Sequence, residues 1–237
     1  MPGWPQTREV LEEAQRRLAA EEPEPWRPAS GSACVVGATF VAFSTRRDPA
    51  GTERSWAAAV AGRSSVVLGA GVVAPYEAGY LALREGPLLE RAVRELLAKP
   101  GVELDVLVVN ASGRDHPRGA GLALHLGDVL GVPTVGVTDR PLVAVPDEAG
   151  RLVLDGREVG RAVVTRGGAR PVFAHAAWRT DAEVAAEVVR AAAGRARTPE
   201  PLRRARFLAR AQRARDEGRL PPGWAMDRLV EPRFHSR

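Results

Sequence analysis

The sequence predicts an α/β fold in which a mixed β-sheet is flanked by helices, and three observations support this. Strand-like runs follow one another closely at residues 32–44, 55–63 and 65–74, which favours an antiparallel meander. The continuous apolar run at residues 102–110 is typical of a strand that is buried on both faces of a sheet. Helical periodicity then alternates with short apolar runs, as expected when helices cover a sheet.

The other elements follow from periodicity and from turn residues. Residues 7–20 place apolar side chains on one helical face, and a proline-rich stretch ends that helix. Pro87 is expected to open the second helix, because proline fits the first helical position, and Thr180 is expected to cap a later one. Further helices are expected at residues 119–130, 180–193 and 201–216. Further strands are expected in the interior at residues 134–137 and, as short peripheral strands, at 143–145, 152–154, 162–165 and 171–174.

This order of elements, three strands followed by alternating helices and strands, matches a ribonuclease H-like fold. The length of 237 residues favours one main domain. We expect that domain at residues 31–217, an N-terminal helical extension at residues 1–30, and an irregular C-terminal tail at residues 218–237.

Composition narrows the class of protein. Apolar residues make up 45% and charged residues 27%, which is ordinary for a globular protein. Cys34 is the single cysteine, so an intrachain disulfide is excluded, and its apolar neighbours predict a buried thiol. We expect a cytoplasmic protein with no membrane partner, because residues 1–26 lack an apolar signal core. The net charge of +5 comes mainly from arginine, which indicates either nucleic-acid binding or a biased genome.

Two segments carry a motif. Residues 75–86 read Pro-Tyr-Glu-Ala-Gly-Tyr-Leu-Ala-Leu-Arg-Glu-Gly, and residues 105–118 read Asp-Val-Leu-Val-Val-Asn-Ala-Ser-Gly-Arg-Asp-His-Pro-Arg. The second places a polar loop directly after the buried apolar run. Together they resemble the endonuclease V family, which nicks nucleic acid near deaminated adenine (inosine) using Mg²⁺. The resemblance extends over most of the chain and implies a ribonuclease H-like fold of the endonuclease V type.

The resemblance also implies which residues stand at the catalytic positions. Glu85 and His116 keep the family's residue. Four positions are substituted, because the family has three aspartates and one lysine where this chain has Thr39, Asn110, Arg206 and Asp139.

These substitutions remove most of the negative charge that a divalent cation needs. Mg²⁺ prefers carboxylate oxygens, and a positive charge about 4 Å from a divalent ion costs several kcal/mol even at an effective dielectric constant near 20. We therefore expect no metal cofactor. We also hypothesise that Arg206 forms an ion pair with Glu85 or Asp139 in place of the metal.

The resemblance further implies a surface for nucleic acid. In the family a Pro-Tyr-Ile-Pro wedge separates a base from its stack, and Pro75 and Tyr76 keep half of it. Gly113 and Gly127 either line a base pocket or allow close internal packing. Arg203, Arg206 and Arg210 lie on one face of the last helix, which either contacts phosphate groups or is solvent-exposed. The residues expected to contact nucleic acid are Pro75, Tyr76, Gly113, Arg118, Gly127 and Arg203.

Three functions remain open on the sequence alone. The leading one is a catalytically degenerate endonuclease V homologue that retains binding to DNA or RNA. The second is an active nuclease that uses Mg²⁺ or Mn²⁺ at an altered site, held by Glu85, Asn110 and Asp115, or with Asp139 as a further ligand. The third is a protein-interaction scaffold whose cleft is closed. The sequence leaves the oligomeric state open.

Overall fold

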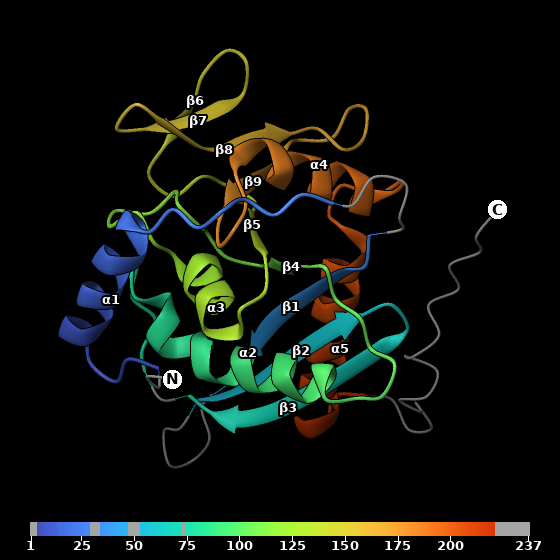
Figure 1. Ribbon diagram of the computed structural model, residues 1–237. Helices are drawn as coiled ribbons and strands as arrows, with labels where there is room; N and C mark the ends of the chain where they lie inside the picture. Colours follow the sequence, from blue (N-terminus) through green and yellow to red (C-terminus); the bar gives the residue numbers. More distant parts are fainter. Residues whose placement is uncertain (1–3, 29–33, 47–52, 73, 221–237) are drawn as a thin grey trace.

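The computed structural model describes residues 4–28, 34–46, 53–72 and 74–220, and in these residues nine strands form one mixed sheet (Figure 1). The strands are β1 (Val36–Phe43), β2 (Arg54–Ala61), β3 (Ser64–Gly71), β4 (Val106–Val109), β5 (Thr134–Thr138), β6 (Val145–Pro146), β7 (Arg151–Leu154), β8 (Arg157–Val163) and β9 (Val172–Ala176). The helices are α1 (Arg8–Ala20), α2 (Leu81–Leu97), α3 (Leu122–Leu130), α4 (Ala182–Ala193) and α5 (Glu200–Asp216).

The strand order is β3-β2-β1-β4-β5-β9-β8-β7-β6. The first three strands form the expected antiparallel meander, and β1, β4 and β5 run parallel to one another. The register pairs Thr39 of β1 with Val109, the last residue of β4. Asn110, the first residue after β4, therefore lies beside the middle of β1, close to Thr39.

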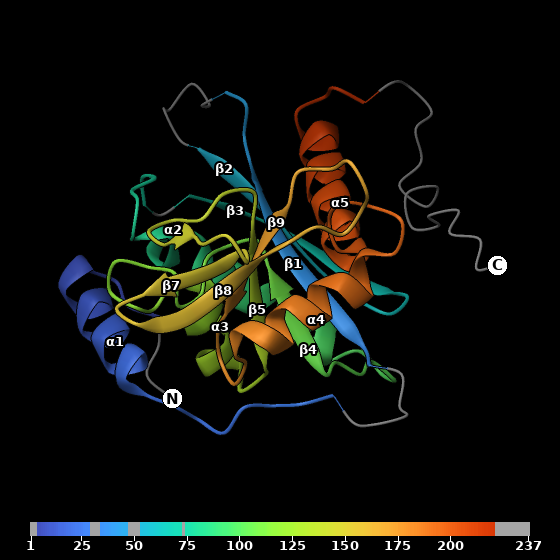
Figure 2. The same ribbon diagram turned by 90° about the horizontal axis from the view of Figure 1, so that it is seen from above.

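Helices cover both faces of the sheet, as Figures 1 and 2 show. Side chains of β2 alternate between the two faces: Ala57 and Ala59 belong to the core under α2 and α3, whereas Ala58 and Val60 belong to the core under α4 and α5. This alternation is the two-residue period of a strand. The sheet is therefore buried on both sides, as the apolar composition of these strands predicts.

The second helix begins earlier than the sequence predicts. Pro87 lies inside α2, whose first residue is Leu81, so the expectation that Pro87 opens the helix is wrong. Buried residues on α2 follow the spacing of one helical face from its first turn onward, namely Ala82, Gly86, Leu89, Val93 and Leu96. Tertiary burial of this face outweighs the local cost of an internal proline. Arg84 and Glu85 consequently belong to the helix.

Three further expectations are corrected. Strand β9 is fully buried between β5 and β8, because α4 covers it, so it is not peripheral. Asp181 caps α4 by accepting the Val184 N–H at 2.8 Å, whereas the Thr180 hydroxyl donates to the Thr134 carbonyl at 2.6 Å. Cys34 is exposed, because it precedes β1 at the edge of the fold.

The N-terminal helix packs against the main fold. Leu11 and Leu18 of α1 are fully buried in the core shared with α2 and α3. Trp4 stacks on His125 with ring centroids 4.6 Å apart, and a Cβ at Gly86 would lie 2.3 Å from the Trp4 ring. The domain boundary at residue 30 stays a prediction, and most of the expected tail lies outside the described residues. None of the helices described here has the length and apolarity to cross a membrane.

Candidate functional site

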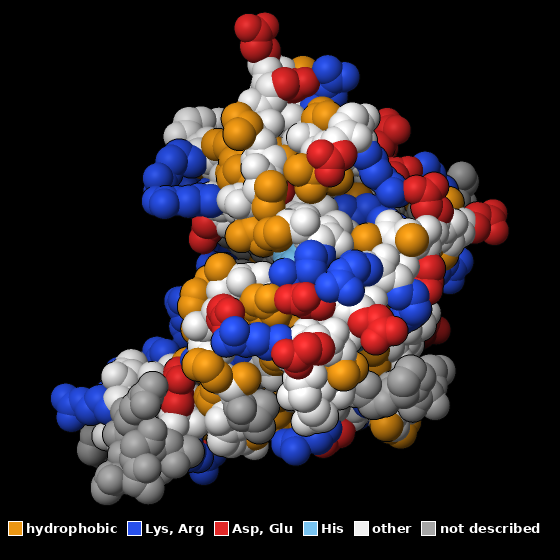
Figure 3. Space-filling model, turned by 90° about the vertical axis from the view of Figure 1, so that its left-hand side faces the viewer, with side chains coloured by type: hydrophobic (Ala, Val, Ile, Leu, Met, Phe, Trp, Pro, Cys, Tyr) orange, Lys and Arg blue, Asp and Glu red, His pale blue; other side chains and the backbone are white. Residues whose placement is uncertain are grey.

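A cleft opens where the segments after β4 and β5 meet the segment between β3 and α2. Its volume is about 310 Å³. Figure 3 shows the molecular surface hollowed between the lobe that carries β6 and β7 and the body below it, with arginine side chains nearby. Residues from five parts of the chain line the cleft, among them Gln15, Tyr76, Gly79, Asn110, His116, Thr138 and Leu142.

Asn110 lines the cleft, Arg206 lies behind Asn110 and bonds it, and Thr39 lies beside Asn110 on β1; these three residues are called the floor. Thr39 is fully buried, and its hydroxyl donates to the Ala58 carbonyl of the neighbouring strand at 2.9 Å. Asn110 accepts a hydrogen bond at its Oδ1 from Nη2 of Arg206 at 3.2 Å. The structure thus brings together three positions that the resemblance implies, although more than 160 residues separate the first from the last. At each of them a polar group already contacts the protein.

Arg206 does not form the ion pair expected from the sequence. Among the described residues it makes no salt bridge with Glu85 or Asp139, because Asp139 bonds Arg197 at 2.6 Å. The guanidinium of Arg206 lies over the Phe40 ring, 5.4 Å from its centre, and its Nε is buried without a hydrogen-bond partner. Burial is the main cause that lowers the pKa of Arg206, and Arg210 adds to it.

Glu85 lies on α2, one helical turn after Leu81, and is partly buried. Burial raises the pKa of its carboxyl to about 8, and the charge of the neighbouring Arg84 acts in the opposite direction. Glu85 is therefore mostly protonated at neutral pH. Arg84 itself is held by Glu53 at 2.5 Å and by the Ala74 carbonyl at 2.9 Å.

Gln15, Gly79 and His116 line the cleft, and Arg118 and Asp115 lie behind the lining and bond to it; these five residues are called the rim. The Arg118 N–H donates to Nδ1 of His116 at 3.2 Å, so the proton of the neutral ring is on Nε2, which donates to the Gly79 carbonyl at 3.2 Å. Burial lowers the pKa of His116 to about 4. The guanidinium of Arg118 donates to Gln15 at 2.6 Å and to Gly79 at 2.7 Å. His116 is thus a neutral, positioned group at neutral pH.

Asp115 organises the opposite side of the rim. Its side chain is fully buried, and its two oxygens accept the backbone N–H groups of Leu142, Val143 and Ala144 at 2.7, 2.9 and 2.8 Å. One of these oxygens also lies 3.6 Å from Nδ1 of His175. Both oxygens therefore hold the loop after β5, which accounts for Asp115 without a metal ion.

The other residues expected at the site lie as follows. Tyr76 is 71% exposed, and Pro75 beside it is exposed, so both remain accessible for stacking. A Cβ on Gly113 would lie 2.1 Å from the Ala176 carbonyl oxygen. One on Gly127 would lie 2.3 Å from Trp178. Both glycines are explained by internal packing and neither lines the cleft. Arg203 is exposed and bonds Glu200 at 2.5 Å, so its charge is already compensated and we do not include it in the nucleic-acid surface proposed below.

Sequence reasoning missed several residues of the cleft, among them Gln15, Thr138 and Leu142. Gln15 comes from α1, about one hundred residues before its partner Arg118. Thr138 contacts Nε2 of His175 at 2.7 Å, and burial lowers the pKa of His175 to about 4. Leu142 contacts Asp115 through its backbone. Thr138 could have been identified as a site residue, because it ends a buried strand that a polar loop follows. No local sequence signal identifies Gln15 or Leu142 as site residues.

These residues do not fit a divalent cation. The amide oxygen of Asn110 already accepts from Arg206, Thr39 brings no negative charge, and Arg206 is itself a cation, which leaves Glu85 as the one carboxyl group where the family resemblance implies carboxylates. In the described part of the chain there is no group of three or more His, Cys, Asp or Glu side chains that could hold a metal ion. A hard divalent ion requires several free oxygen ligands, and the floor does not supply them.

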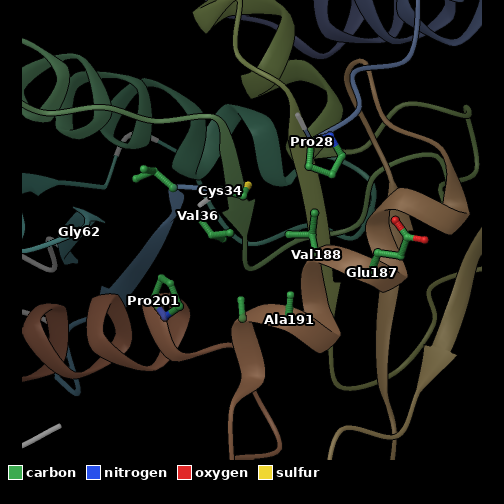
Figure 4. A pocket seen from close by; sticks show the side chains of 10 residues that line it. Pro28, Cys34, Val36, Gly62, Glu187, Val188, Ala191 and Pro201 are labelled. Carbon is green, nitrogen blue, oxygen red and sulfur yellow. The ribbon is translucent and has the colours of Figure 1, made fainter. Parts of the chain in front are cut away.

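A second cavity, of about 580 Å³, lies at the amino end of β1, away from the cleft (Figure 4). Its lining is mostly apolar and comes from the starts of β1 and α5 and from α4, with Glu187 as the single acidic side chain: Pro28, Cys34, Val35, Val36, Gly62, Glu187, Val188, Ala191, Ala192 and Pro201. The described residues of this lining offer no paired acid and base, so the chemistry of this chain is expected at the cleft.

The fold and the cleft together define a class of protein. A meander followed by two parallel strands, in the order β3-β2-β1-β4-β5 with helices on both faces, is a ribonuclease H-like sheet, and the cleft lies beside its central strands. A profile of the endonuclease V family matches residues 41–207. This chain belongs to the endonuclease V family.

Individual relatives agree with this assignment. An endonuclease V of Streptomyces coelicolor is 37% identical over 233 residues, which cover 88% of this chain and 92% of the relative. The crystal structure of an endonuclease V from Streptomyces avermitilis has a TM-score of 0.74 at 31% identity, covering 93% and 98% of the two chains. A Ciona intestinalis endonuclease V in complex with DNA that contains an inosine has a TM-score of 0.74 at 20% identity, covering 88% and 98%, and shares the fold.

Proposed function

We propose that this chain is an endonuclease V-like protein that binds DNA or RNA and has lost phosphodiester hydrolysis. The observation that carries the proposal is the hydrogen bond between Arg206 and Asn110 at 3.2 Å. It places a fixed positive charge at a position where the family resemblance implies a carboxylate. A divalent cation beside this guanidinium would be repelled, and metal-assisted hydrolysis would lose its activated water.

Retained binding is supported by the state of the cleft. The cavity beside Asn110 is open, and the exposed Tyr76 ring lies at its entrance. Aromatic rings stack on bases without requiring a metal ion. The Ciona relative binds DNA that contains inosine, and this chain has the same fold. The net charge of +5 also favours a polyanionic partner. We propose that the protein acts in the cytoplasm.

The geometry weighs against the two alternatives. An active site built from Glu85, Asn110 and Asp115 would have to release Asp115 from three backbone amides. Adding Asp139 would require breaking its bond with Arg197. A scaffold with a closed cleft does not agree with a cavity of about 310 Å³ at this position.

A paired assay of binding and nicking tests the proposal. Fluorescently labelled duplex and single-stranded oligonucleotides, with and without inosine, are incubated with the protein in Mg²⁺ or Mn²⁺. We expect binding that weakens with salt and no nicked product. Nicking by the wild-type protein that Glu85→Ala abolishes would overturn the loss of hydrolysis. Absence of salt-dependent binding to every oligonucleotide would overturn the retained binding.

A further inference from the structure

Arg206 has more hydrogen-bond donors than partners. A guanidinium carries five N–H groups, yet in the described part of the chain Arg206 makes one hydrogen bond, from Nη2 to Asn110. Its Nε is buried with no acceptor. Its Nη1 donors also have no hydrogen-bond partner among the described residues, and the side chain as a whole is only partly buried. Arg206 is therefore suited to bind an additional group that carries oxygen atoms.

A second guanidinium increases the positive charge at this point. Arg210 lies one helical turn after Arg206 on α5, and both guanidinium groups lie over the same ring, Phe40, at 5.4 and 5.6 Å from its centre. The charge of Arg210 is one of the causes that lower the pKa of Arg206, so the two groups repel each other. An anion that bound both would relieve this repulsion.

In the described residues, neither Arg206 nor Arg210 forms a salt bridge with an acidic side chain. Asp139 is the acidic group that acts on Arg206, but it bonds Arg197 at 2.6 Å. Arg203, one turn earlier on the same helix, differs because it already bonds Glu200 at 2.5 Å. Arg206 and Arg210 thus carry two neighbouring positive charges that no salt bridge offsets in the described part of the chain.

We propose that Arg206 and Arg210 on α5 form an anion site, next to Asn110, for the phosphodiester oxygens of a nucleic-acid strand. The inference rests on the proposed function and deepens it, because the guanidinium groups take over the electrostatic attraction of phosphate from a metal ion. The planar fork of an arginine binds two oxygens of a phosphate at once. Phe40 keeps the fork of Arg206 in place, and Asn110 fixes its orientation.

Arg206→Gln and Arg203→Gln test the site as a matched pair. Each removes one positive charge from α5, but only the first removes a guanidinium without a carboxylate partner. Binding to fluorescein-labelled oligothymidylate is measured by anisotropy at several salt concentrations. We expect R206Q to weaken binding by roughly tenfold and to reduce the salt slope by about 0.7. R203Q should change affinity by less than about twofold. Equal losses in both variants would overturn the site.

Inorganic phosphate provides a second, independent measurement. We expect phosphate to raise the melting temperature of the wild-type protein and of R203Q, but not of R206Q. A wild-type protein that binds no oligonucleotide would end the proposed function, and the phosphate measurement would then decide the anion site alone. A wild-type protein that binds oligothymidylate, with no difference between R206Q and R203Q, would end the anion site alone.

Arg210→Gln covers the case in which R206Q does not fold. Arg210 is exposed, so its replacement leaves the core intact. We expect R210Q to weaken oligothymidylate binding by about threefold, because one of the two guanidinium groups remains. Unchanged affinity in R210Q, with circular dichroism equal to that of the wild type, would contradict a site built from both arginines.

Discussion

The rim and the floor of the cleft differ in how they use their polar groups. In the rim, His116 and Arg118 keep the family motif and are joined to Gln15 and Gly79 by hydrogen bonds. On the floor, residues without negative charge stand where the family resemblance implies aspartates. The rim is held together by the chain itself, so it persists whether or not the floor binds a metal ion.

This difference shows that the scaffold and the chemistry of the cleft can separate. The rim positions a loop and a helix, and its contacts contribute to folding. The floor contributes little to folding through charge, because its polar groups make single hydrogen bonds to neighbouring strands or side chains. Substitutions in the two regions should therefore affect different properties: stability for the rim, and ligand binding for the floor.

The largest effect is expected for Asp115→Ala in the rim. This change leaves three backbone N–H groups without their acceptor and should lower the free energy of unfolding by about 3–5 kcal/mol. Urea denaturation measures it. Asp139→Ala is the control, because its exposed ion pair with Arg197 should contribute less than about 1 kcal/mol. Similar losses in the two variants would contradict the role given to Asp115.

A smaller effect, of opposite sign, is expected for Glu85→Gln. The pKa of this carboxyl is about 8 in the folded protein and near 4.5 when unfolded, so the wild type loses stability as the pH rises from 4.5 to 8. The amide cannot ionise. The variant should therefore be more stable than the wild type by about 2 kcal/mol at pH 8.5, allowing for partial solvent access.

Denaturation curves at pH 4.5 and pH 8.5 measure this difference. At pH 4.5 the advantage of Glu85→Gln should be small, because the wild-type carboxyl is protonated in the folded state and partly so in the unfolded state. An advantage that is equal at both pH values would show that the carboxyl does not titrate as described. If Glu85→Gln instead gained stability over the wild type as the pH falls, the result would indicate an uncompensated cation beside Glu85.

The smallest effect is expected for Gln15→Ala, which tests how α1 supports the rim. The change removes the acceptor of the Arg118 Nε–H and a donor to the Gly79 carbonyl. It should lower the free energy of unfolding by about 1–2 kcal/mol. Gln6→Ala, whose side chain bonds the Trp4 carbonyl near the surface, is the control. A loss no greater than that of the control would mean that α1 does not support the rim.

Much of the fold could be predicted from the sequence, because apolar periodicity determines which segments are buried. The meander, the buried run before Asn110 and the bounds of α4 and α5 followed from this pattern. The start of α2 did not, because a local rule for Pro87 competes with burial of a face that only the folded core reveals. The place of β9 inside the sheet likewise depends on which strands it pairs with.

The site was predicted less completely, for a physical reason. That Thr39, Asn110 and Arg206 lie close together could be predicted, because the resemblance assigns them to family positions and a shared fold preserves those positions. The partner of Arg206 was predicted wrongly, because the choice between nearby acceptors depends on side-chain positions within a few ångströms, which the sequence does not determine. The contacts of Asp115 could not be predicted, because its partners are backbone amides and any residue supplies a backbone amide.

Calorimetric titration with Mn²⁺ tests the central claim that the floor does not hold a divalent cation. The wild-type protein is compared with Thr39→Asp/Asn110→Asp/Arg206→Asp, which restores the carboxylates that the family resemblance implies. We predict no heat of specific binding for the wild type and one saturable site for the triple variant. Saturable Mn²⁺ binding to the wild-type protein that Glu85→Ala abolishes would contradict the account.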